Sequence, residues 1–475
     1  MTPNDRITRI RKDLEALIGT GSIVDDPAAI ARTSRDTWVI SVWRGLTRVP
    51  QPQPACVVRP RTTAEVAATI TYASRERIAV VPYGAGSGVC GAILAPAGSI
   101  VLDLGAMCAL RAIDQRALLA TAEAGMLGSD FEAALAGVGF STGHFPQSIA
   151  LSSVGGWVAT RAAGQFSTKY GNIEDLFVAF EAVLPSGSII RTRPVPRAAT
   201  GPDLRHLFLG AEGTTGVLTE VTFKIHPLPE ASERQAIAFA SMASGLEALR
   251  RILRAGWRPA VLRLYDEIEA GRMFAGVAAE GESLLLVLTE GPATMAAAER
   301  VAVEAICQAV DGRLLGPAAV ESWLEHRNKV PEFEFFLNQG MIVDTIEVAA
   351  NWDRIDDLYA GVLAAIREVP GLIVASGHSS HSYPIGTNIY FTFAAKPDRP
   401  EDMEQLYFRI WDAAMAATLA AGGTISHHHG IGRVRLGWLE RELGSAYPVL
   451  ATLKRALDPL GIMNPGALLP EPDEA

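Results

Sequence analysis

Three consecutive histidines, His427, His428 and His429, stand in the segment "GGTISHHHGIGR" (422–433) and make up a third of the 9 histidines in the chain. Three roles are compatible with these histidines: metal ligation, hydrogen bonding in a domain interface, and proton transfer. An imidazole that titrates near neutrality is suited to proton transfer. In an extended segment successive side chains alternate, so we expect His427 and His429 to point one way and His428 the other. Side chains arranged in this way do not converge on one ion, and we expect no metal site.

Tyr390 stands in "NIYFTF" (388–393), where apolar and polar residues alternate as in a strand with one buried face. The alternation places Tyr390 on the face opposite Ile389 and Phe391, together with Asn388 and Thr392. The pattern is compatible with two roles for Tyr390: a tyrosine buried in the core, or a tyrosine that transfers a proton.

Arg263 stands in "VLRLYDE" (261–267), which also reads as a strand. An arginine is always protonated and stabilises negative charge that develops during a reaction. The alternative is a strand arginine paired with Asp266 or Glu267.

The elements that must position these residues include a helix from the capping box "TTAE" (62–65) through residue 77, and a short buried strand, "IAVVPY" (78–83). The loop that follows, "GAGSGVCG" (84–91), matches GxGxxG at Gly86, Gly88 and Gly91. The next segment contains Pro96 and Gly98 and then a strand, whereas a dinucleotide-binding fold requires a helix there. A plain tight turn remains open, as does a turn whose N–H groups hold an anion such as pyrophosphate.

Two further stretches are rich in small residues: "HFPQSIALSSVGGWVATRAAG" (144–164), which we expect to be a loop, and "FLGAEGTTGVLTEVTFKI" (208–225), which feeds a half-buried strand. Small residues let the backbone approach a flat ligand closely. Three such loops, each followed by sheet, predict one extended ligand threaded between strands.

From about residue 231 the pattern changes to repeated strand-helix-strand units. Helices are predicted at 245–256, 295–310 and 352–368, between strands such as 235–240, 283–290, 341–349 and 387–395. These units predict a second, substrate-covering domain with a sheet that carries helices on one face. A last helix (401–421) leads into the histidine segment.

Composition limits the classes of function. The chain has 475 residues and a formal charge of −10, from 42 Lys and Arg against 52 Asp and Glu, so we expect no nucleic-acid partner. The N-terminus lacks the pattern of a signal peptide and the longest apolar runs are too short to span a membrane, so we expect a cytoplasmic protein without an integral membrane segment. The 4 cysteines are scattered and suggest neither a disulfide framework nor a zinc site.

Together these pieces resemble the vanillyl-alcohol oxidase superfamily of FAD-linked oxidases, and most of all its alkyldihydroxyacetone-phosphate synthase branch, also called alkylglycerone-phosphate synthase. The motifs that carry the resemblance are "PYGAGSG" (82–88), "GHFPQSIALSSVGGWVATRAAG" (143–164), "YGNIEDL" (170–176), "ATGPDLRHLFLGAEGTTGVLTE" (199–220), "VLRLYDE", "IYFTFA" (389–394) and "GGTISHHHGIGRVR" (422–435).

The resemblance implies an α+β fold: a PCMH-type FAD-binding domain of two α/β subdomains, with an inserted cap domain whose sheet is covered by helices. The implied boundaries are 1–230 for the FAD-binding domain, with a helical lead over 1–50, then 231–420 for the cap and 421–475 for a C-terminal return. The implied cofactor is FAD. Because the first loop has no histidine to tether the ring, and its one nucleophile, Cys90, is expected to face the core, we expect FAD to be bound non-covalently. A homodimeric assembly is compatible with the resemblance.

The resemblance also assigns site residues. It implies catalytic roles for Tyr390, as proton donor or acceptor, and for Arg263, and proton transfer beside the flavin by one or more of His427, His428 and His429. It implies FAD contacts from Pro82, Tyr83, Gly84, Ala85, Gly86, Ser87, Gly88, Gln147, Ser148, Ile149, Ala150, Leu151, Ser152, Ser153, Ala159, Thr160, Arg161, Ala162, Glu212, Gly213, Thr214, Thr215, Gly216, Val217 and Leu218.

The chain departs from its relatives at two places. Hydroxyacid dehydrogenases of the superfamily bind a metal through His and Glu residues, whereas here Tyr383, Tyr390 and His428 replace them. The synthases hold a substrate phosphate with an arginine where this chain has Glu334, although Arg327 or Lys329 are open as substitutes. A carboxylate repels a phosphate, whereas Phe333, Phe335 and Phe336 offer ring surface to an apolar substrate.

We therefore expect an FAD-dependent oxidoreductase acting on a partly apolar alcohol or hydroxy acid. The alternative is an ether-lipid enzyme that uses FAD without net redox.

Overall fold

The computed structural model describes residues 2–330 and 332–470. Its N-terminal part contains a four-stranded sheet in the order β1-β2-β4-β3, in which β2, β4 and β3 run parallel. Thr62 caps α4 through the N–H of Glu65, as predicted, but the Glu65 carboxylate accepts from the N–H of Arg61, so the reciprocal half of the box is displaced by one residue. The elements are α1 (Pro3–Ile18), β1 (Ile23–Val24), α2 (Pro27–Thr33), α3 (Val39–Leu46), β2 (Cys56–Val58), α4 (Thr63–Glu76), β3 (Val80–Tyr83) and β4 (Ile100–Asp103).

A five-stranded antiparallel sheet follows, in the order β5-β6-β10-β8-β9. The expectation that β10 is half-buried holds only in part: on the face predicted to be open, Leu218 and Thr222 are buried, whereas Glu220 is partly exposed and Lys224 is exposed. The elements are β5 (Leu110–Asp114), β6 (Leu119–Glu123), α5 (Gly128–Ala136), β7 (Phe140–Ser141), α6 (Val154–Thr160), α7 (Ser167–Tyr170), α8 (Ile173–Leu176), β8 (Phe177–Val183), β9 (Ile189–Arg191), β10 (Val217–Lys224) and β11 (His226–Pro227).

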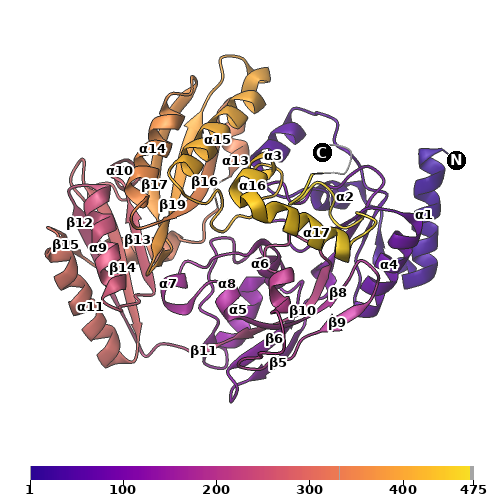
Figure 1. The fold of residues 1–475 in the computed structure, drawn as a ribbon, viewed down its shortest axis with the longest axis horizontal. Coiled ribbons are helices and arrows are strands. Elements are labelled where there is room, and N and C mark those ends of the chain that lie inside the picture. The colour runs from indigo at the N-terminus through magenta and orange to yellow at the C-terminus, as the bar shows by residue number, and fades with distance from the viewer. Residues whose placement is uncertain (1, 331, 471–475) are drawn as a thin grey trace.

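The strand-helix-strand units form one eight-stranded sheet in the order β15-β12-β14-β13-β17-β19-β16, with β18 paired to β19 (Figure 1). The elements are β12 (Ala231–Phe239), α9 (Met242–Arg254), β13 (Val261–Tyr265), α10 (Glu267–Met273), β14 (Ser283–Gly291), α11 (Ala293–Gln308), β15 (Arg313–Gly316), α12 (Ala318–His326), α13 (Phe333–Leu337), β16 (Ile342–Asn351), α14 (Ile355–Arg367), β17 (Leu372–Ser379), β18 (Ser382–Tyr383), β19 (Gly386–Ala395) and α15 (Met403–Ala420).

Helices cover both faces of part of this sheet, so the expectation of helices on one face alone was incomplete. On one face, α9, α11, α14 and α15 pack on a core that includes Leu264, Ile389 and Phe391. On the other face, α10 and α12 pack over β12, β13 and β14 around Tyr265 and Trp323. The remainder of that second face, along β17, β19 and β16, lines the cavity described below.

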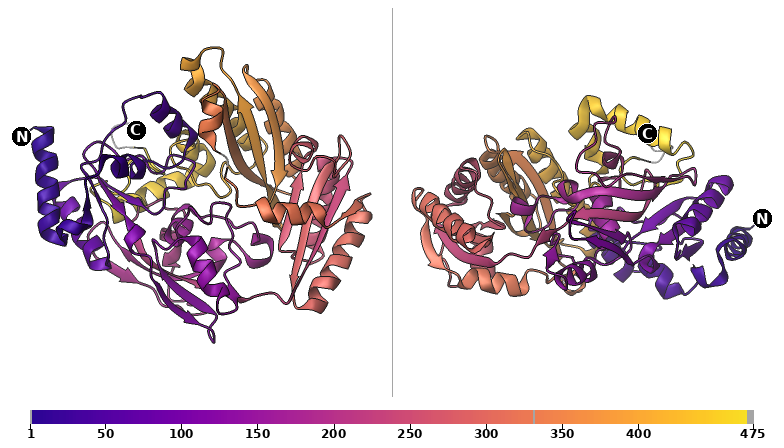
Figure 2. Two further views of the ribbon diagram at one scale, coloured as in Figure 1. Left: turned by 180° about the vertical axis from the view of Figure 1, so that it is seen from behind. Right: turned by 90° about the horizontal axis from the view of Figure 1, so that it is seen from below.

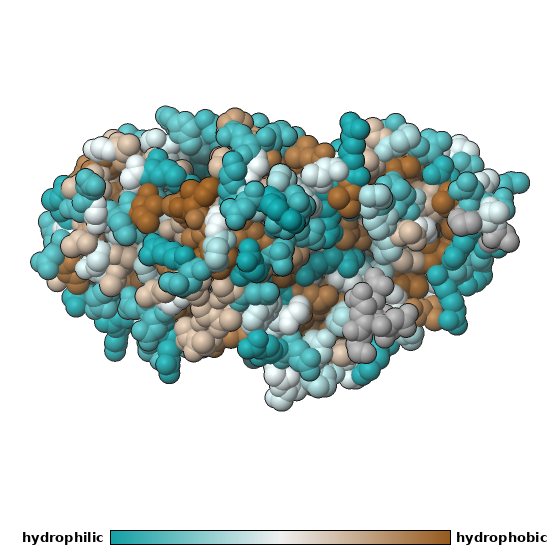
Figure 3. All heavy atoms as spheres, turned by 90° about the horizontal axis from the view of Figure 1, so that it is seen from above, coloured by the Kyte–Doolittle hydropathy of each residue, from teal (hydrophilic) through white to brown (hydrophobic). Residues whose placement is uncertain are grey.

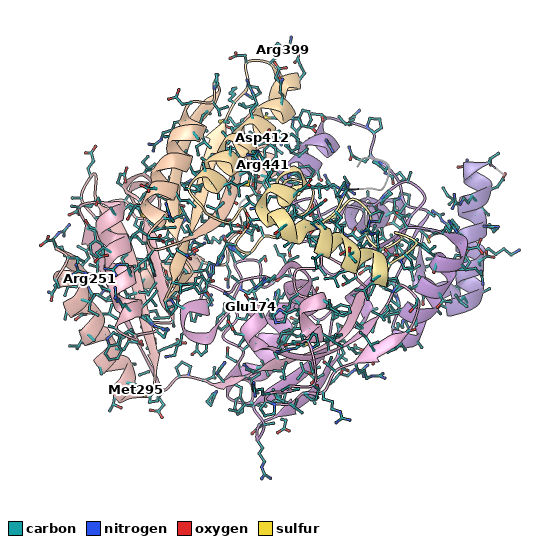
Figure 4. The ribbon with its side chains drawn as sticks, viewed as in Figure 1. Glu174, Arg251, Met295, Arg399, Asp412 and Arg441 are labelled. Carbon is teal, nitrogen blue, oxygen red and sulfur yellow. The ribbon has the colours of Figure 1, made fainter. Side chains whose placement is uncertain are left out.

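The C-terminal segment returns to the N-terminal sheets, as Figures 1 and 2 show in yellow, through α16 (Leu436–Leu443) and α17 (Tyr447–Leu457). Lys454 donates to the carbonyl of Thr214, and Val80 forms a parallel bridge with Met463. Near the other end of the segment, the indole of Trp438 donates to Asp412 of α15 (Asp412 is labelled in Figure 4). The C-terminal segment is therefore attached to the N-terminal sheets at its far end and to α15 at its near end.

No helix among the described residues is long and apolar enough to cross a membrane. Hydrophilic residues cover most of the upper face, and hydrophobic residues form separate patches between them (Figure 3). Scattered patches of this kind are normal on protein surfaces.

Candidate active site

A cavity of about 1370 Å³ lies where the sheets meet. All three small-residue stretches contribute to its lining, together with α12, α13 and the second face of the eight-stranded sheet. The three stretches therefore line one cavity, as the sequence predicted.

Most of the residues expected to contact FAD line this cavity: Pro82, Tyr83, Gly84, Ala85, Gly86, Ser87, Gly88, Gln147, Ser148, Ala150, Leu151, Ser152, Ser153, Ala159, Thr160, Ala162, Glu212, Gly213, Thr215, Gly216, Val217 and Leu218. Three do not. Ile149 is buried in the core, Arg161 turns away to pair with Glu174, and the Thr214 hydroxyl donates to the carbonyl of Ala211.

The first loop contains glycines at positions where a side chain would collide with neighbouring residues. Gly86 has a φ of +76°, and a Cβ there would collide with the ring of Tyr83. A Cβ at Gly84 would collide with the hydroxyl of Ser153, so the first and second stretches touch at this point. Small residues bring two stretches of backbone against one space, which fits a flat ligand with a pyrophosphate group.

The second stretch is not a loop throughout, because residues 154–160 form helix α6. The hydroxyl of Ser153 accepts the N–H of Gly156 and caps the helix, which is a signal that the sequence contained. The expectation that every stretch leads directly into sheet was therefore wrong for this one. Arg161 closes the helix with a φ of 55°, which explains why its side chain leaves the cavity.

Four side chains form a row across neighbouring strands on the cavity side of the large sheet. Glu347 on β16 lies opposite Tyr390 on β19, Tyr390 opposite His378 on β17, and His378 opposite Tyr265 on β13. The rings of His378 and Tyr390 stack with centroids 4.8 Å apart. The alternation that placed Tyr390 opposite Ile389 and Phe391 is confirmed, since those two residues are buried in the core.

The histidine segment is bent around Glu347, so the expected alternation of its side chains was wrong. The carboxylate of this fully buried residue accepts the N–H of His427 at 2.8 Å and that of His429 at 2.6 Å, with the N–H of His428 at 3.4 Å. His428 and His429 both line the cavity, with ring centroids 6.1 and 5.5 Å from that of Tyr390. His427 is the histidine that turns away, and its ring contacts the hydroxyl of Tyr383.

A second buried carboxylate, Glu212, holds the next part of the segment. It accepts the N–H of Ile431 at 2.6 Å and that of Gly432 at about 3 Å. Glu212 belongs to the third small-residue stretch, so this contact fixes the histidines relative to the predicted FAD loops. Burial raises the pKa of Glu212 above its ordinary value.

Burial also decides the charge of the histidines. It lowers the pKa of His427 to about 4 and that of His429 to about 3, and it places the pKa of His428 well below its ordinary value. The expectation that these imidazoles titrate near neutrality was therefore wrong. They are neutral at pH 7, and a neutral imidazole both accepts and donates a proton.

Tyr390 is protonated under the same conditions, because burial raises its pKa. For Glu347, burial favours the neutral acid, but the charge of Arg435, the N–H of His427 and the rings of His427 and His428 together outweigh it, so the pKa of Glu347 lies below its ordinary value. The buried guanidinium of Arg435 lies 3.2 Å from that carboxylate.

Arg263 lines the cavity, and the alternative of an arginine paired with Asp266 or Glu267 was wrong. Its guanidinium donates to the hydroxyl of Tyr265 and lies 2.6 Å from Nε2 of His378, and no ion pair with Asp266 or Glu267 forms in the described part of the chain. The guanidinium carbons of Arg263 and Arg327 each lie 5.9 Å from the centroid of the Trp323 ring.

Arg327 is enclosed by aromatic rings, at 4.9 Å from Phe145 and 5.0 Å from Phe166, and it donates to the side chain of Gln165. Burial lowers its pKa to about 10, so it remains charged at neutral pH. Lys329 also lines the cavity.

Of the aromatic residues expected to face an apolar substrate, Phe333 and Phe336 line the cavity, as does Glu334. Phe335 does not, because it is 61% exposed on the outer side of α13.

Sequence reasoning missed three residues of the site: Glu347, His378 and His381. A signal existed for Glu347, since a charge within the strand pattern of residues 341–349 requires a partner if it is buried. The described residues contain no cluster of three or more His, Cys, Asp or Glu side chains suited to a metal ion.

Comparison with known proteins gives two matching family models. The model for the C-terminal domain of FAD linked oxidases matches residues 228–468, and that for an FAD binding domain matches residues 54–193. The uncharacterised FAD-linked oxidoreductase YgcU of Escherichia coli K12 is 36% identical over 480 residues, which cover 96% of this chain and 97% of that protein.

Two solved structures extend the comparison. Alkyldihydroxyacetonephosphate synthase superposes with a TM-score of 0.81 at 26% identity, over 96% of this chain and 84% of that one. Substrate-bound p-cresol methylhydroxylase superposes with a TM-score of 0.76 at 17% identity, over 99% and 98%. The latter shows a shared PCMH-type fold.

Proposed function

The chain belongs to the family of FAD-linked oxidases, and from this premise we propose that it oxidises a partly apolar hydroxy acid or alcohol, with proton transfer by Tyr390 and the cavity histidines beside the flavin. Family membership makes the protein an FAD-linked oxidoreductase. The choice of substrate and the roles of individual residues are the proposal.

One observation carries the proposal: Tyr390, His428 and His429 gather on the wall of the same cavity that the small-residue stretches line. These stretches fit FAD, and Gly84 to Gly88 would hold its pyrophosphate. Bound FAD supplies an acceptor for two electrons. The neutral ring of His428 would take the substrate hydroxyl proton as the C–H bond breaks, and the protonated hydroxyl of Tyr390 would donate toward the substrate oxygen. Arg263 would hold negative charge that develops on that oxygen.

The cavity also supports a class of substrate. Trp323, Phe333 and Phe336 provide apolar surface, whereas Arg263 and Arg327 carry positive charge without an ion-pair partner among the described residues. A buried cation is stable when an anion reaches it. A substrate with an apolar body and a carboxylate satisfies both parts of the wall, which favours a hydroxy acid.

An ether-lipid synthase is the alternative, supported by the structural likeness to alkyldihydroxyacetonephosphate synthase at 26% identity. Glu334 argues against it. This carboxylate lies on the cavity wall and repels a phosphate dianion.

The two functions are separated by assaying the holoprotein with a panel of hydroxy acids and alcohols and an electron-accepting dye. A parallel reaction follows exchange of a labelled fatty alcohol into acyl-dihydroxyacetone phosphate. We expect dye reduction with at least one hydroxy acid of apolar body and no exchange. Efficient exchange without dye reduction would replace the oxidase by the synthase.

FAD is expected to be bound non-covalently. Cys90, the nucleophile of the first loop, is 2% exposed, its thiol accepts a hydrogen bond from Arg435, and burial raises the pKa of the thiol. After acid precipitation we expect all of the flavin in the supernatant. Flavin that stays with the precipitated protein contradicts this prediction.

The division into domains at residues 230 and 420, a cytoplasmic location and a homodimeric assembly belong to the same proposal. The domain division is supported by the position of the eight-stranded sheet, whose strands begin at Ala231 and end at Ala395.

A further inference from the structure

Three side chains form a continuous hydrogen-bonded line at one edge of the cavity. Nδ1 of His428 lies 2.9 Å from Nδ1 of His427, and Nε2 of His427 lies 2.7 Å from the hydroxyl of Tyr383. Both contacts are within hydrogen-bond distance and use both ring nitrogens of His427. A ring bonded through both nitrogens can receive a proton on one side and release one on the other.

The two ends of the line face different surroundings. His428 lines the cavity beside Tyr390, whereas His427 and Tyr383 are partly exposed without being part of the cavity wall. The residues that follow Tyr383, Pro384 and Ile385, are exposed, and Ile385 is 73% exposed. The line therefore runs from the cavity wall toward the surface of the protein.

The surrounding residues hold this geometry. The ring of His381 packs on both histidines, with centroids 5.1 Å from His427 and 4.9 Å from His428, and Ser167 fixes His381 through a contact of 2.7 Å. Glu347 holds the backbone N–H of His427. The rings are thus prevented from turning freely away from one another.

The outer end is fixed by Asn172, whose amide donates to the Tyr383 hydroxyl at 2.7 Å. A phenolic oxygen accepts two hydrogen bonds and donates one. Tyr383 can therefore accept from both Asn172 and His427 while its own O–H points to water.

We propose that His428, His427 and Tyr383 are a proton relay that carries the substrate hydroxyl proton from the cavity to solvent. The proton binds Nε2 of His428, and the Nδ1 proton of His428 passes to Nδ1 of His427. The Nε2 proton of His427 then passes to the Tyr383 oxygen, which releases its own proton to water. Each group ends with as many protons as it began with, no electrons move along the line, and one proton leaves the protein.

The source of the proton rests on the proposed function, but the relay itself does not. The direct test uses holoprotein labelled with ¹⁵N in its histidines, and nuclear magnetic resonance measures how fast the ring protons of His427 and His428 exchange with water. The signals are assigned by their loss in His427→Gln and His428→Gln. In Tyr383→Phe, which removes one hydroxyl, we expect exchange of the shared Nδ1 proton to slow by about tenfold or more.

Tyr359→Phe is the matched control, because Tyr359 packs against the opposite face of the same sheet. Added imidazole should partly restore exchange in Tyr383→Phe, which a merely structural effect of the variant does not predict. If exchange in Tyr383→Phe equals that of the wild type, the relay is wrong.

A second measurement separates failure of the relay from failure of the proposed function. Flavin reduction by a hydroxy acid and proton release to an indicator dye are followed together in weak buffer. We expect the two to coincide in the wild type, and proton release to lag in Tyr383→Phe. If proton release coincides with flavin reduction in Tyr383→Phe as well, the relay is wrong. If the wild type shows no flavin reduction, the proposed function is wrong, and the exchange measurement alone then tests the relay.

Discussion

Replacement of Tyr390 by phenylalanine is expected to lower the rate of substrate oxidation by about a hundredfold, the range for loss of a positioned acid or base. The ring of Tyr390 lies on the cavity wall next to those of His428 and His429, and burial keeps its hydroxyl protonated at neutral pH. The phenylalanine ring fills the same space and still stacks on His378. We therefore expect FAD content to be unchanged, which the flavin absorbance of the purified variant measures.

The control for this variant is Tyr359→Phe. Tyr359 stacks on Phe391, the neighbour of Tyr390 along β19, but from the opposite face of the sheet, and its hydroxyl donates to Asp266. Its loss removes one partly buried hydrogen bond, which costs about 1 kcal/mol of stability. Turnover should stay near the wild-type value. A Tyr390→Phe enzyme as active as this control contradicts a role in proton transfer.

Replacement of Glu347 by glutamine is expected to lower the free energy of unfolding by about 3–5 kcal/mol, because it leaves the guanidinium of Arg435 buried without a countercharge. Both side chains are fully buried and 3.2 Å apart. The same carboxylate accepts N–H groups from His427 and His429, so the histidine segment should loosen as well. Denaturant-induced unfolding of the holoprotein measures the change in stability.

Glu404→Gln provides the comparison for that measurement. Glu404 pairs with Arg44, but both side chains remain partly exposed to solvent, so the loss should be below about 1 kcal/mol. If the two variants are destabilised equally, Glu347 is not the anchor of the histidine segment.

Local patterns predicted much of the fold. Strand alternation placed Tyr390 correctly, because the register of β19 is set by the apolar residues Ile389 and Phe391 on its buried face. The absence of a helix after Gly91 correctly excluded a dinucleotide-binding fold of the Rossmann type, and the three small-residue stretches do converge on one cavity.

The errors arose where distant residues determine local structure. The histidine segment was expected to be extended, but Glu347, 80 residues earlier in the chain than His427, bends it by accepting its N–H groups. The shifted pKa values have the same origin, since burial of the three rings depends on how the whole sheet packs. The side chains of Arg161 and Ile149 do not line the predicted FAD site, because Arg161 ends helix α6 and Ile149 is buried in the core.

In the proposed function, substrate oxidation and flavin reduction take place together in this cavity. Anaerobic titration of the holoprotein with a hydroxy acid of apolar body tests it most directly, with the visible flavin absorbance as the measurement. We expect complete bleaching at one substrate molecule per flavin, with the corresponding oxo acid as product. A flavin that stays oxidised with every hydroxy acid and alcohol, in a protein that exchanges fatty alcohol into acyl-dihydroxyacetone phosphate, would contradict it.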